Sequence, residues 1–265
     1  MRRMEQAYAY HRLMLYRCRF PRPPLSEFVE QIWLYGGYSV PHSRERLMPT
    51  GTTELVINLG TGMAVVAGVY SRPAFIETTD MSAGILGIHF RPGGAFPFFG
   101  VPAHALHNET VELESLWGSD AALLRERVLS AANDEMRFDI LENELMRRAR
   151  TLEHHRAVSH GLFRLGRCST VADVVEETGL SQRRFIQLFD GEVGITPKVY
   201  SRVTRFQRVL RRVHALDDVD WSDVAMAAGY YDQSHLIHEF ASLAGITPSQ
   251  YFARKTEHLN HVPAD

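Results

Sequence analysis

The sequence predicts an α+β protein with an N-terminal antiparallel β-domain that ends in helices, followed by an all-α domain of two helix-turn-helix units joined by a long helix. Three observations predict this fold. Runs of β-branched and aromatic residues, bounded by Gly or Pro, recur in the first hundred residues. Apolar residues at helical spacing dominate the remainder. A repeat with an offset of 50 or 51 residues lies near the C-terminus.

Composition excludes several classes of protein. The 265 residues are 45% hydrophobic with a net charge of −2, which excludes intrinsic disorder and leaves enough apolar material for two cores. Two cysteines, Cys18 and Cys168, are too few for a disulfide framework and suit a reducing compartment. No apolar run reaches the roughly 18 residues of a membrane helix, and polar residues interrupt any signal-peptide core. We therefore expect a cytoplasmic protein that does not contact membranes.

The patterns in the first 150 residues predict strands followed by helices. The predicted strands span residues 28–38, 53–59, 63–69 and 83–90. The predicted helices span 121–130 and 135–150. The expected organisation is an N-terminal extension (1–20), a β-rich sensor or dimerisation domain with a helical tail (21–150), a linker (151–157), an all-α domain (158–255) and a C-terminal tail (256–265).

The repeat defines two similar units. Gly194-Ile-Thr-Pro recurs as Gly245-Ile-Thr-Pro at an offset of 51. Within each unit a Gly ends one helix and a capping residue begins the next, with Gly179 and Ser181 matched by Gly229 and Asp232. This is the plan of a helix-turn-helix, whose second helix enters the major groove of DNA.

A long helix is predicted between the two units, over residues 197–216. About 18 helical residues span roughly 27 Å, which is of the order needed to place two helices in successive major grooves.

Charge is distributed unevenly along these units. Residues 181–212 hold eight basic and two acidic side chains, whereas residues 217–245 hold six acidic side chains and no Lys or Arg. A basic block of this kind is typical of a phosphate-facing surface, although a solvated helix face is the alternative.

Residues 165–255 resemble the DNA-binding domain of the AraC/XylS family of bacterial transcription regulators. The resemblance lies in Val171-Ala-Asp-Val-Val, in Gly179-Leu-Ser with Phe189, and in Val224-Ala-Met-Ala-Ala-Gly-Tyr-Tyr-Asp-Gln-Ser-His-Leu-Ile-His-Glu-Phe240 followed by Gly245-Ile-Thr-Pro. It implies a seven-helix domain that binds double-stranded DNA and regulates transcription. RNA polymerase and a second copy of the chain are further partners that it suggests. The chain departs from the family at Gln187 and His238, where an Arg is common.

The resemblance also assigns residues to the DNA interface. Residues expected to face bases are Gln182, Arg183, Ile186, Gln187, Gln233, Ser234, Ile237 and His238. Residues expected at phosphates or at the rim are Ser181, Arg184, Lys198, Arg202, Arg205, Arg208 and His235. The residue types suit this role, because Arg reads guanine and Gln reads adenine through paired hydrogen bonds.

Residues 20–150 are similar to an N-terminal domain often fused to this DNA-binding type, whose ligand is undefined. The similarity lies in Met48-Pro-Thr-Gly-Thr-Thr-Glu-Leu-Val-Ile-Asn58 and in Leu86-Gly-Ile-His-Phe-Arg-Pro-Gly-Gly-Ala-Phe-Pro-Phe-Phe-Gly-Val-Pro102. It implies a distorted relative of cupin-like barrels that senses a small-molecule effector.

The candidate effector contacts are Trp33, Glu54, His89 and Arg91, which lie in or beside predicted strands. The alternative for Glu54 and Arg91 is a buried ion pair that holds the domain together, and we favour it.

The N-terminal domain has two alternative functions, a metal-binding enzyme and a dimerisation module. His42, His89, His104 and His107 would suit a metal-binding barrel enzyme, but no firm carboxylate partner accompanies them. No motif of nucleophilic catalysis is present. We therefore expect no enzyme, no catalytic residue, no metal ligand and no cofactor. A purely structural dimerisation module is the other alternative. The sequence leaves the effector, the operator and the sign of regulation open.

Overall fold

Six antiparallel strands form the main sheet of the N-terminal domain. The computed structural model describes residues 15–37, 42–78 and 83–264. In spatial order, the strands are β1 (Leu15–Arg19), β2 (Val29–Gly36), β7 (Ile85–Phe90), β4 (Glu54–Asn58), β5 (Ala64–Ala67) and β8 (Thr110–Glu112). The strands predicted at 28–38, 53–59, 63–69 and 83–90 are thereby confirmed. Strand β1 comes from the predicted N-terminal extension, whose residues 1–14 lie outside the described part of the chain.

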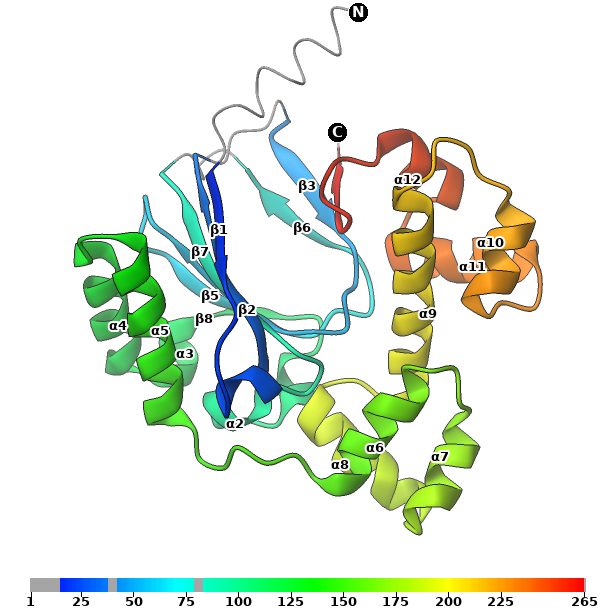
Figure 1. The fold of residues 1–265 in the computed structure, drawn as a ribbon, viewed down its shortest axis with the longest axis horizontal. Coiled ribbons are helices and arrows are strands. Elements are labelled where there is room, and N and C mark those ends of the chain that lie inside the picture. The colour runs from blue at the N-terminus through cyan, green and yellow to red at the C-terminus, as the bar shows by residue number, and fades with distance from the viewer. Residues whose placement is uncertain (1–14, 38–41, 79–82, 265) are drawn as a thin grey trace, which may run out of the picture.

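Helices cover one face of this sheet. They are α2 (Phe96–Phe99), α3 (Leu113–Trp117), α4 (Ser119–Ser130) and α5 (Asp134–Arg148), with short 3-10 turns η1 (Leu25–Glu27) and η2 (Ala103–Leu106). Alternate strand residues such as Ile32 and Leu34 are buried beneath them. Figure 1 shows α4 and α5 on this face of the sheet, whereas α9 lies on the side of the opposite face. The helical tail is therefore part of the core of the β-domain.

A second, three-stranded sheet pairs a strand near residue 262 with two strands of the N-terminal domain. Its strand order is β6 (Ala74–Glu77), β3 (Arg44–Leu47) and β9 (His261–Pro263). Strand β9 lies in the predicted C-terminal tail and pairs antiparallel with β3, so Arg46 opposes Val262. The sequence did not predict this strand, because three residues show no periodicity and their partner lies more than 200 residues away. The expected kinship with cupin-like barrels stays a prediction.

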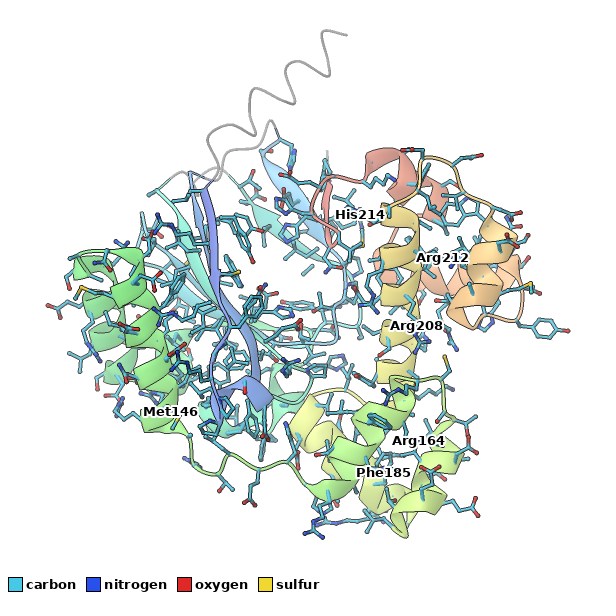
Figure 2. All side chains as sticks on the ribbon, in the orientation of Figure 1. Met146, Arg164, Phe185, Arg208, Arg212 and His214 are labelled. Atoms are coloured by element: carbon cyan, nitrogen blue, oxygen red, sulfur yellow. The ribbon has the colours of Figure 1, made fainter. Side chains whose placement is uncertain are left out.

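Seven helices form the C-terminal region within described residues 156–254. They are α6 (Arg156–Leu165), α7 (Val171–Thr178), α8 (Gln182–Val193), α9 (Pro197–His214), α10 (Trp221–Ala228), α11 (Gln233–Ala244) and α12 (Pro248–Arg254). The long helix α9 supports two cores. Phe185 and Phe189 belong to the first, and Phe206 and Phe240 belong to the second. Figure 2 shows Arg208, Arg212 and His214 along α9, and Phe185 within the first unit.

The N-terminal domain contacts both helical units. At the second unit, Gln207 of α9 donates to the carbonyl of Pro49 at 2.7 Å, and Arg46 donates to the carbonyl of Ala244 at the end of α11 at 3.1 Å. At the first unit, His104 of η2 lies 3.5 Å from the Asp190 carboxylate of α8. These contacts fix the helical units on the β-domain at two separate places.

Strand β9 is expected to contribute to stability through Val262, whose side chain is fully buried against α9 and α11. Val262→Ala removes two methyl groups and leaves a cavity, so it should lower the free energy of unfolding by about 2 kcal/mol. Urea denaturation of the full chain measures this. Leu123→Ala on α4, where the side chain is 57% exposed, is the control and should change stability by less than about 0.5 kcal/mol. Equal effects of the two substitutions would contradict a structural role for β9.

Candidate nucleic-acid interface

The first helix-turn-helix consists of α7 and α8. Thr170 and Asp173 form a capping box that begins α7, and Gly179 ends it with a φ of 67°, which a Gly adopts without strain. Ser181 then caps α8 by accepting from the backbone N–H of Arg184 at 3.3 Å. Phe185 and Phe189 bury one side of α8. Its other side is consequently free to face a ligand.

The second unit repeats this arrangement with α10 and α11. Asp220 caps α10, Gly229 ends it with a φ of 88°, and Asp232 caps α11 by accepting from the His235 N–H at 2.7 Å. Leu236 and Phe240 bury the inner side of α11. The offsets of 50 and 51 in the sequence thus correspond to equivalent turns and caps.

The residues predicted to face bases lie on the outer sides of the two second helices. Seven of them are exposed and Ile186 is half-buried. On α8, Arg184 donates to the Gln187 side chain at 3.0 Å, and on α11 the Gln233 side chain accepts from Ser222 at 3.2 Å. The structure therefore leaves all eight positions accessible. Their contact with bases stays a prediction.

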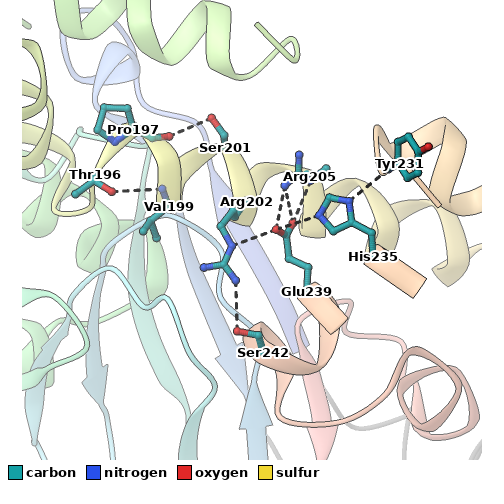
Figure 3. A network of polar contacts seen from close by, with 10 residues as sticks. All are labelled: Thr196, Pro197, Val199, Ser201, Arg202, Arg205, Tyr231, His235, Glu239 and Ser242. Carbon is teal, nitrogen blue, oxygen red and sulfur yellow. Dashed lines mark hydrogen bonds and ion pairs between the residues drawn. The ribbon is translucent and has the colours of Figure 1, made fainter. Parts of the chain in front are cut away.

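Glu239 joins α11 to α9 through two arginines. Arg202 donates to its carboxylate at 3.1 Å, and Arg205 donates at 2.8 and 3.0 Å (Figure 3). Only 8% of the Glu239 side chain is exposed. Burial opposes the charge on Arg205, but the hydrogen bonds and charge of Glu239 outweigh it and raise the pKa of Arg205.

Arg208 of α9 makes hydrogen bonds to two residues at and beyond the end of α6. It donates to the Gly166 carbonyl at 2.7 Å, at the end of α6, and to the Cys168 sulfur at 2.8 Å. Arg202, Arg205 and Arg208 are half-buried and join helices to one another, and their expected contact with phosphates stays a prediction. Helical spacing placed them off the apolar stripe of α9 correctly, but it carries no information about groups on α6 and α11.

The other predicted rim residues are accessible. Ser181, Arg184, Lys198 and His235 are all exposed. Within the described part of the chain, the ammonium of Lys198 makes no hydrogen bond or ion pair, whereas His235 accepts from the Tyr231 N–H at 3.4 Å. Lys198 is therefore a cation of α9 that is available to a ligand, as are the exposed Arg211 and Arg212.

Three of the four candidate effector residues share one face of the main sheet. Trp33 lies opposite Gly87, and both Gln31 and Glu54 lie opposite His89 in the strand register. A Cβ on Gly87 would lie 2.3 Å from the Trp33 ring, so the absence of a side chain there lets the indole cross β7. Trp33, Glu54 and His89 are half-buried on the face that α4 and α5 do not cover.

The predicted Glu54–Arg91 ion pair is wrong. Glu54 instead interacts with His89, whose Nδ1 lies 2.9 Å from its carboxylate, while Arg91 is exposed and donates to the Ser26 carbonyl at 2.9 Å. His89 lies within the strand pairing and Arg91 lies beyond the end of β7, which explains the difference. Burial lowers the pKa of His89, but the hydrogen bond and charge of Glu54, with Glu30, outweigh it and raise that pKa overall.

The four histidines considered as metal ligands lie apart. His42 interacts with Glu45, His104 lies 3.5 Å from Asp190, and His107 interacts with Ser71, while His89 interacts with Glu54. Among the described residues, no three His, Cys, Asp or Glu side chains are grouped to hold a metal ion. The described helices include none that is both long and apolar enough to span a bilayer.

One protein-family model matches each of the two parts of the chain. A helix-turn-helix domain family matches residues 174–254, and a family described as a domain of unknown function (DUF6597) matches residues 18–112. No curated protein matches the sequence significantly.

Solved structures resemble the chain only weakly. ToxT from Vibrio cholerae O395 is 10% identical, with 93% of this chain and 98% of that chain covered and a TM-score of 0.42. A probable AraC family transcriptional regulator from Rhodopseudomonas palustris is 19% identical, with 38% and 97% covered and a TM-score of 0.33. The C-terminal domain of AraT, a response regulator from Geobacillus stearothermophilus, is 16% identical, with 39% and 89% covered and a TM-score of 0.36. Since every TM-score is below 0.5, none of these likenesses assigns a function.

The fold and the family match agree that the C-terminal part of the chain is a helix-turn-helix domain. More particularly, that part holds two helix-turn-helix units joined by α9, and the N-terminal part is similar to the DUF6597 family.

Glu239→Gln should loosen the junction between α9 and α11. Arg202 and Arg205 then lose the negatively charged carboxylate that both of them contact. The free energy of unfolding should therefore fall by about 1–3 kcal/mol. Chemical denaturation of the full chain measures this. Glu176→Gln, at an exposed position of α7, serves as the control. If both variants unfold at the wild-type denaturant concentration, the ion pairs of Glu239 do not stabilise the domain.

The Glu54–His89 pair should make stability depend on pH. Because the pKa of His89 is raised in the folded state, its contribution is complete below the unfolded value of about 6.5 and disappears as pH rises through the folded value. The wild type should therefore lose stability relative to Glu54→Gln as pH rises from about 6 to 9. Denaturation curves across this range test the difference, and parallel pH profiles would refute it.

Proposed function

We propose that this protein is a sequence-specific regulator of transcription in the cytoplasm that inserts α8 and α11 into successive major grooves of double-stranded DNA. One observation carries the proposal: two equivalent helix-turn-helix units, with accessible polar residues at the beginnings of their second helices, are fixed to the ends of one 18-residue helix, α9. Helix α9 spans about 27 Å, which is comparable to the roughly 34 Å between successive major grooves.

The exposed residues suggest how bases are read. Arg183 suits a guanine, and Gln182, Gln187 and Gln233 suit adenines, because each offers two hydrogen bonds in the geometry of a base edge. Ile186 and Ile237 offer apolar contact to thymine methyl groups. Ser234 and His238 complete the surface of α11. The second unit, which has no Lys or Arg between residues 217 and 245, relies on neutral contacts.

The N-terminal domain is the proposed effector domain. Trp33, Glu54 and His89 combine an aromatic surface with a carboxylate and an imidazole on one half-buried face, which suits a small ligand with an apolar body and a polar group. The Tyr35 ring on this face contacts His258, at a ring separation of 5.5 Å, in the segment that leads to β9. A ligand bound there would thus adjoin the segment that ties the helical units to the β-domain.

Self-association and contact with RNA polymerase are proposed as further properties. A domain that served only for dimerisation would bind no small-molecule effector. Thermal-shift measurements against a metabolite panel distinguish these roles, because an effector domain gains melting temperature with a specific ligand and a dimerisation module does not.

The base-reading role of α8 is tested with Arg183→Ala. The binding sequence is first selected from random DNA with the full chain, and affinities are then measured by titration. Loss of a bidentate contact to guanine should weaken binding by about 1–3 kcal/mol, roughly 5- to 150-fold, and should relax selection at one base pair. Arg127→Ala is the matched control, since Arg127 is exposed on α4 at the opposite side of the molecule (Figure 1). An Arg183→Ala variant that selects the wild-type sequence with wild-type affinity would rule out this role.

A further inference from the structure

The face of the main sheet that α4 and α5 do not cover carries adjoining aromatic side chains. Tyr16 of β1 packs against Tyr35 of β2 at a ring separation of 4.7 Å, and Tyr35 meets Trp33 edge to face at 5.5 Å. Because Gly87 has no side chain, the Trp33 indole crosses the neighbouring strand β7. Trp33 and Tyr35 are half-buried, and Tyr16 is 44% exposed. The three rings therefore form a continuous and accessible aromatic surface.

The Trp33 ring has no cation of the chain against it. Elsewhere, Arg148 lies over the Trp117 ring at 4.0 Å, and Arg205 lies over the Tyr230 ring at 4.9 Å. Among the described residues, no Arg or Lys side chain lies over Trp33 in this way. The face of an indole carries negative electrostatic potential and attracts cations. The Trp33 ring can therefore accept a cation from outside the chain.

A carboxylate lies beside this ring. Glu54 lies opposite His89 in the strand register, and His89 is two residues from Gly87, which the indole crosses. Residues two apart on a strand share a face and lie about 7 Å from each other. One Glu54 oxygen lies 2.9 Å from Nδ1 of His89, and the other makes no hydrogen bond within the described residues. Since 30% of the Glu54 side chain is exposed, that second oxygen can pair with a ligand.

The charge around the aromatic surface is predominantly negative. Burial, and then the charges of Glu257 and Glu54, raise the pKa of the Tyr35 phenol. Glu257 precedes His258, whose ring contacts Tyr35 at 5.5 Å, so it reaches this face from the segment that leads to β9. The aromatic surface thus adjoins one carboxylate of the sheet and one of the C-terminal segment.

His89 sets how much of this negative charge a ligand meets. Its imidazole lies 2.9 Å from the carboxylate of Glu54 and 3.7 Å from that of Glu30. Burial and the positive charge of Arg91 oppose protonation of His89, whereas Glu54 and Glu30 favour it. A protonated His89 offsets the charge of Glu54. A neutral His89 leaves that charge available to a ligand.

We propose that this face of the sheet binds a small organic cation, with an ammonium group against the Trp33 ring and paired with Glu54. This inference rests on the proposed effector role of the N-terminal domain, whose ligand class it names. The apolar body of the ligand would pack on the Tyr35 and Tyr16 rings. An aromatic face beside a carboxylate is the chemistry by which proteins bind ammonium groups, and the same carboxylates would repel an anion.

The first test observes Trp33 directly in the full chain. The protein has three Trp residues, so Trp33→Phe identifies the Trp33 indole signal in NMR spectra of protein with isotope-labelled tryptophan. The probe is benzyltrimethylammonium, and the neutral 3-phenylpropionamide and anionic 3-phenylpropionate are controls of similar size. The cation should shift the Trp33 signal at a concentration at least about fivefold lower than either control. Equal potency of the three compounds would overturn the proposal.

The second test removes each contact in turn. Glu54→Gln should weaken binding of benzyltrimethylammonium by roughly fivefold or more and leave binding of 3-phenylpropionamide unchanged. Trp33→Leu should weaken it by roughly 2- to 30-fold, measured at the backbone amide of Gly87. Glu126→Gln, at an exposed position of α4, is the control, and circular dichroism checks the fold of each variant. Wild-type affinity of Glu54→Gln for the cation would refute the pairing.

The pH dependence gives a third test, because the charge of the probe does not titrate. As pH rises from about 6 to 9, His89 loses its proton and no longer offsets Glu54, so the wild type should bind the cation more tightly. The affinity of Glu54→Gln should change less over this range. A wild-type affinity that is independent of pH would contradict a ligand contact with Glu54.

The outcomes separate this inference from the proposed function. If the full chain selects no DNA sequence but binds the cation at Trp33, the proposed function fails and the cation site stands. If a neutral or anionic compound shifts the Trp33 signal and the cation does not, the assignment to cations fails while DNA recognition is unaffected. If the Trp33 signal changes with protein concentration and with none of the probes, the face contacts a second copy of the chain and the proposal is overturned.

Discussion

The ion pairs of Glu239 with Arg202 and Arg205 are the interaction on which the geometry of the interface depends. A helix that must enter a groove needs a fixed direction, and apolar contacts alone allow neighbouring helices to slide. Here a carboxylate that is 8% exposed meets two guanidinium groups from successive turns of α9. Because unpairing such a buried charge is costly, α11 is held in one register on α9. The spacing of the two recognition helices follows from that register.

The β-domain reinforces the same arrangement from outside. Strand β9 returns the end of the chain to β3, and Val262 packs among the residues of α9 and α11. Gln207 and Arg46 add polar contacts on this side, while His104 of η2 lies 3.5 Å from Asp190 of α8. Both units are thereby attached to one body. The β-domain therefore contacts the helical units at several places, and the Tyr35 ring also contacts His258 in the segment that leads to β9.

Local sequence rules predicted much of the site because its parts are local. Caps, left-handed glycines and apolar periodicity depend on residues a few positions apart, so the turns at Gly179 and Gly229 followed from spacing. The outward positions of Arg183 and Gln233 followed from the family resemblance. The partners of charged side chains do not follow from spacing. Glu54 binds His89 instead of Arg91 because strand register places them side by side, and Arg208 meets Gly166 because α6 ends beside α9.

The sequence by itself determined the division into a β-domain and a double helix-turn-helix, the main strands, the long helix and the residues that α8 and α11 expose. The strands and helices are encoded by patterns within about 20 residues, and the two units by a repeat at an offset of 50 or 51 residues. The tertiary structure decided which arginines of α9 are engaged and how the last strand closes the small sheet. Such features join segments 30 to more than 200 residues apart, and only the packed chain brings those segments together.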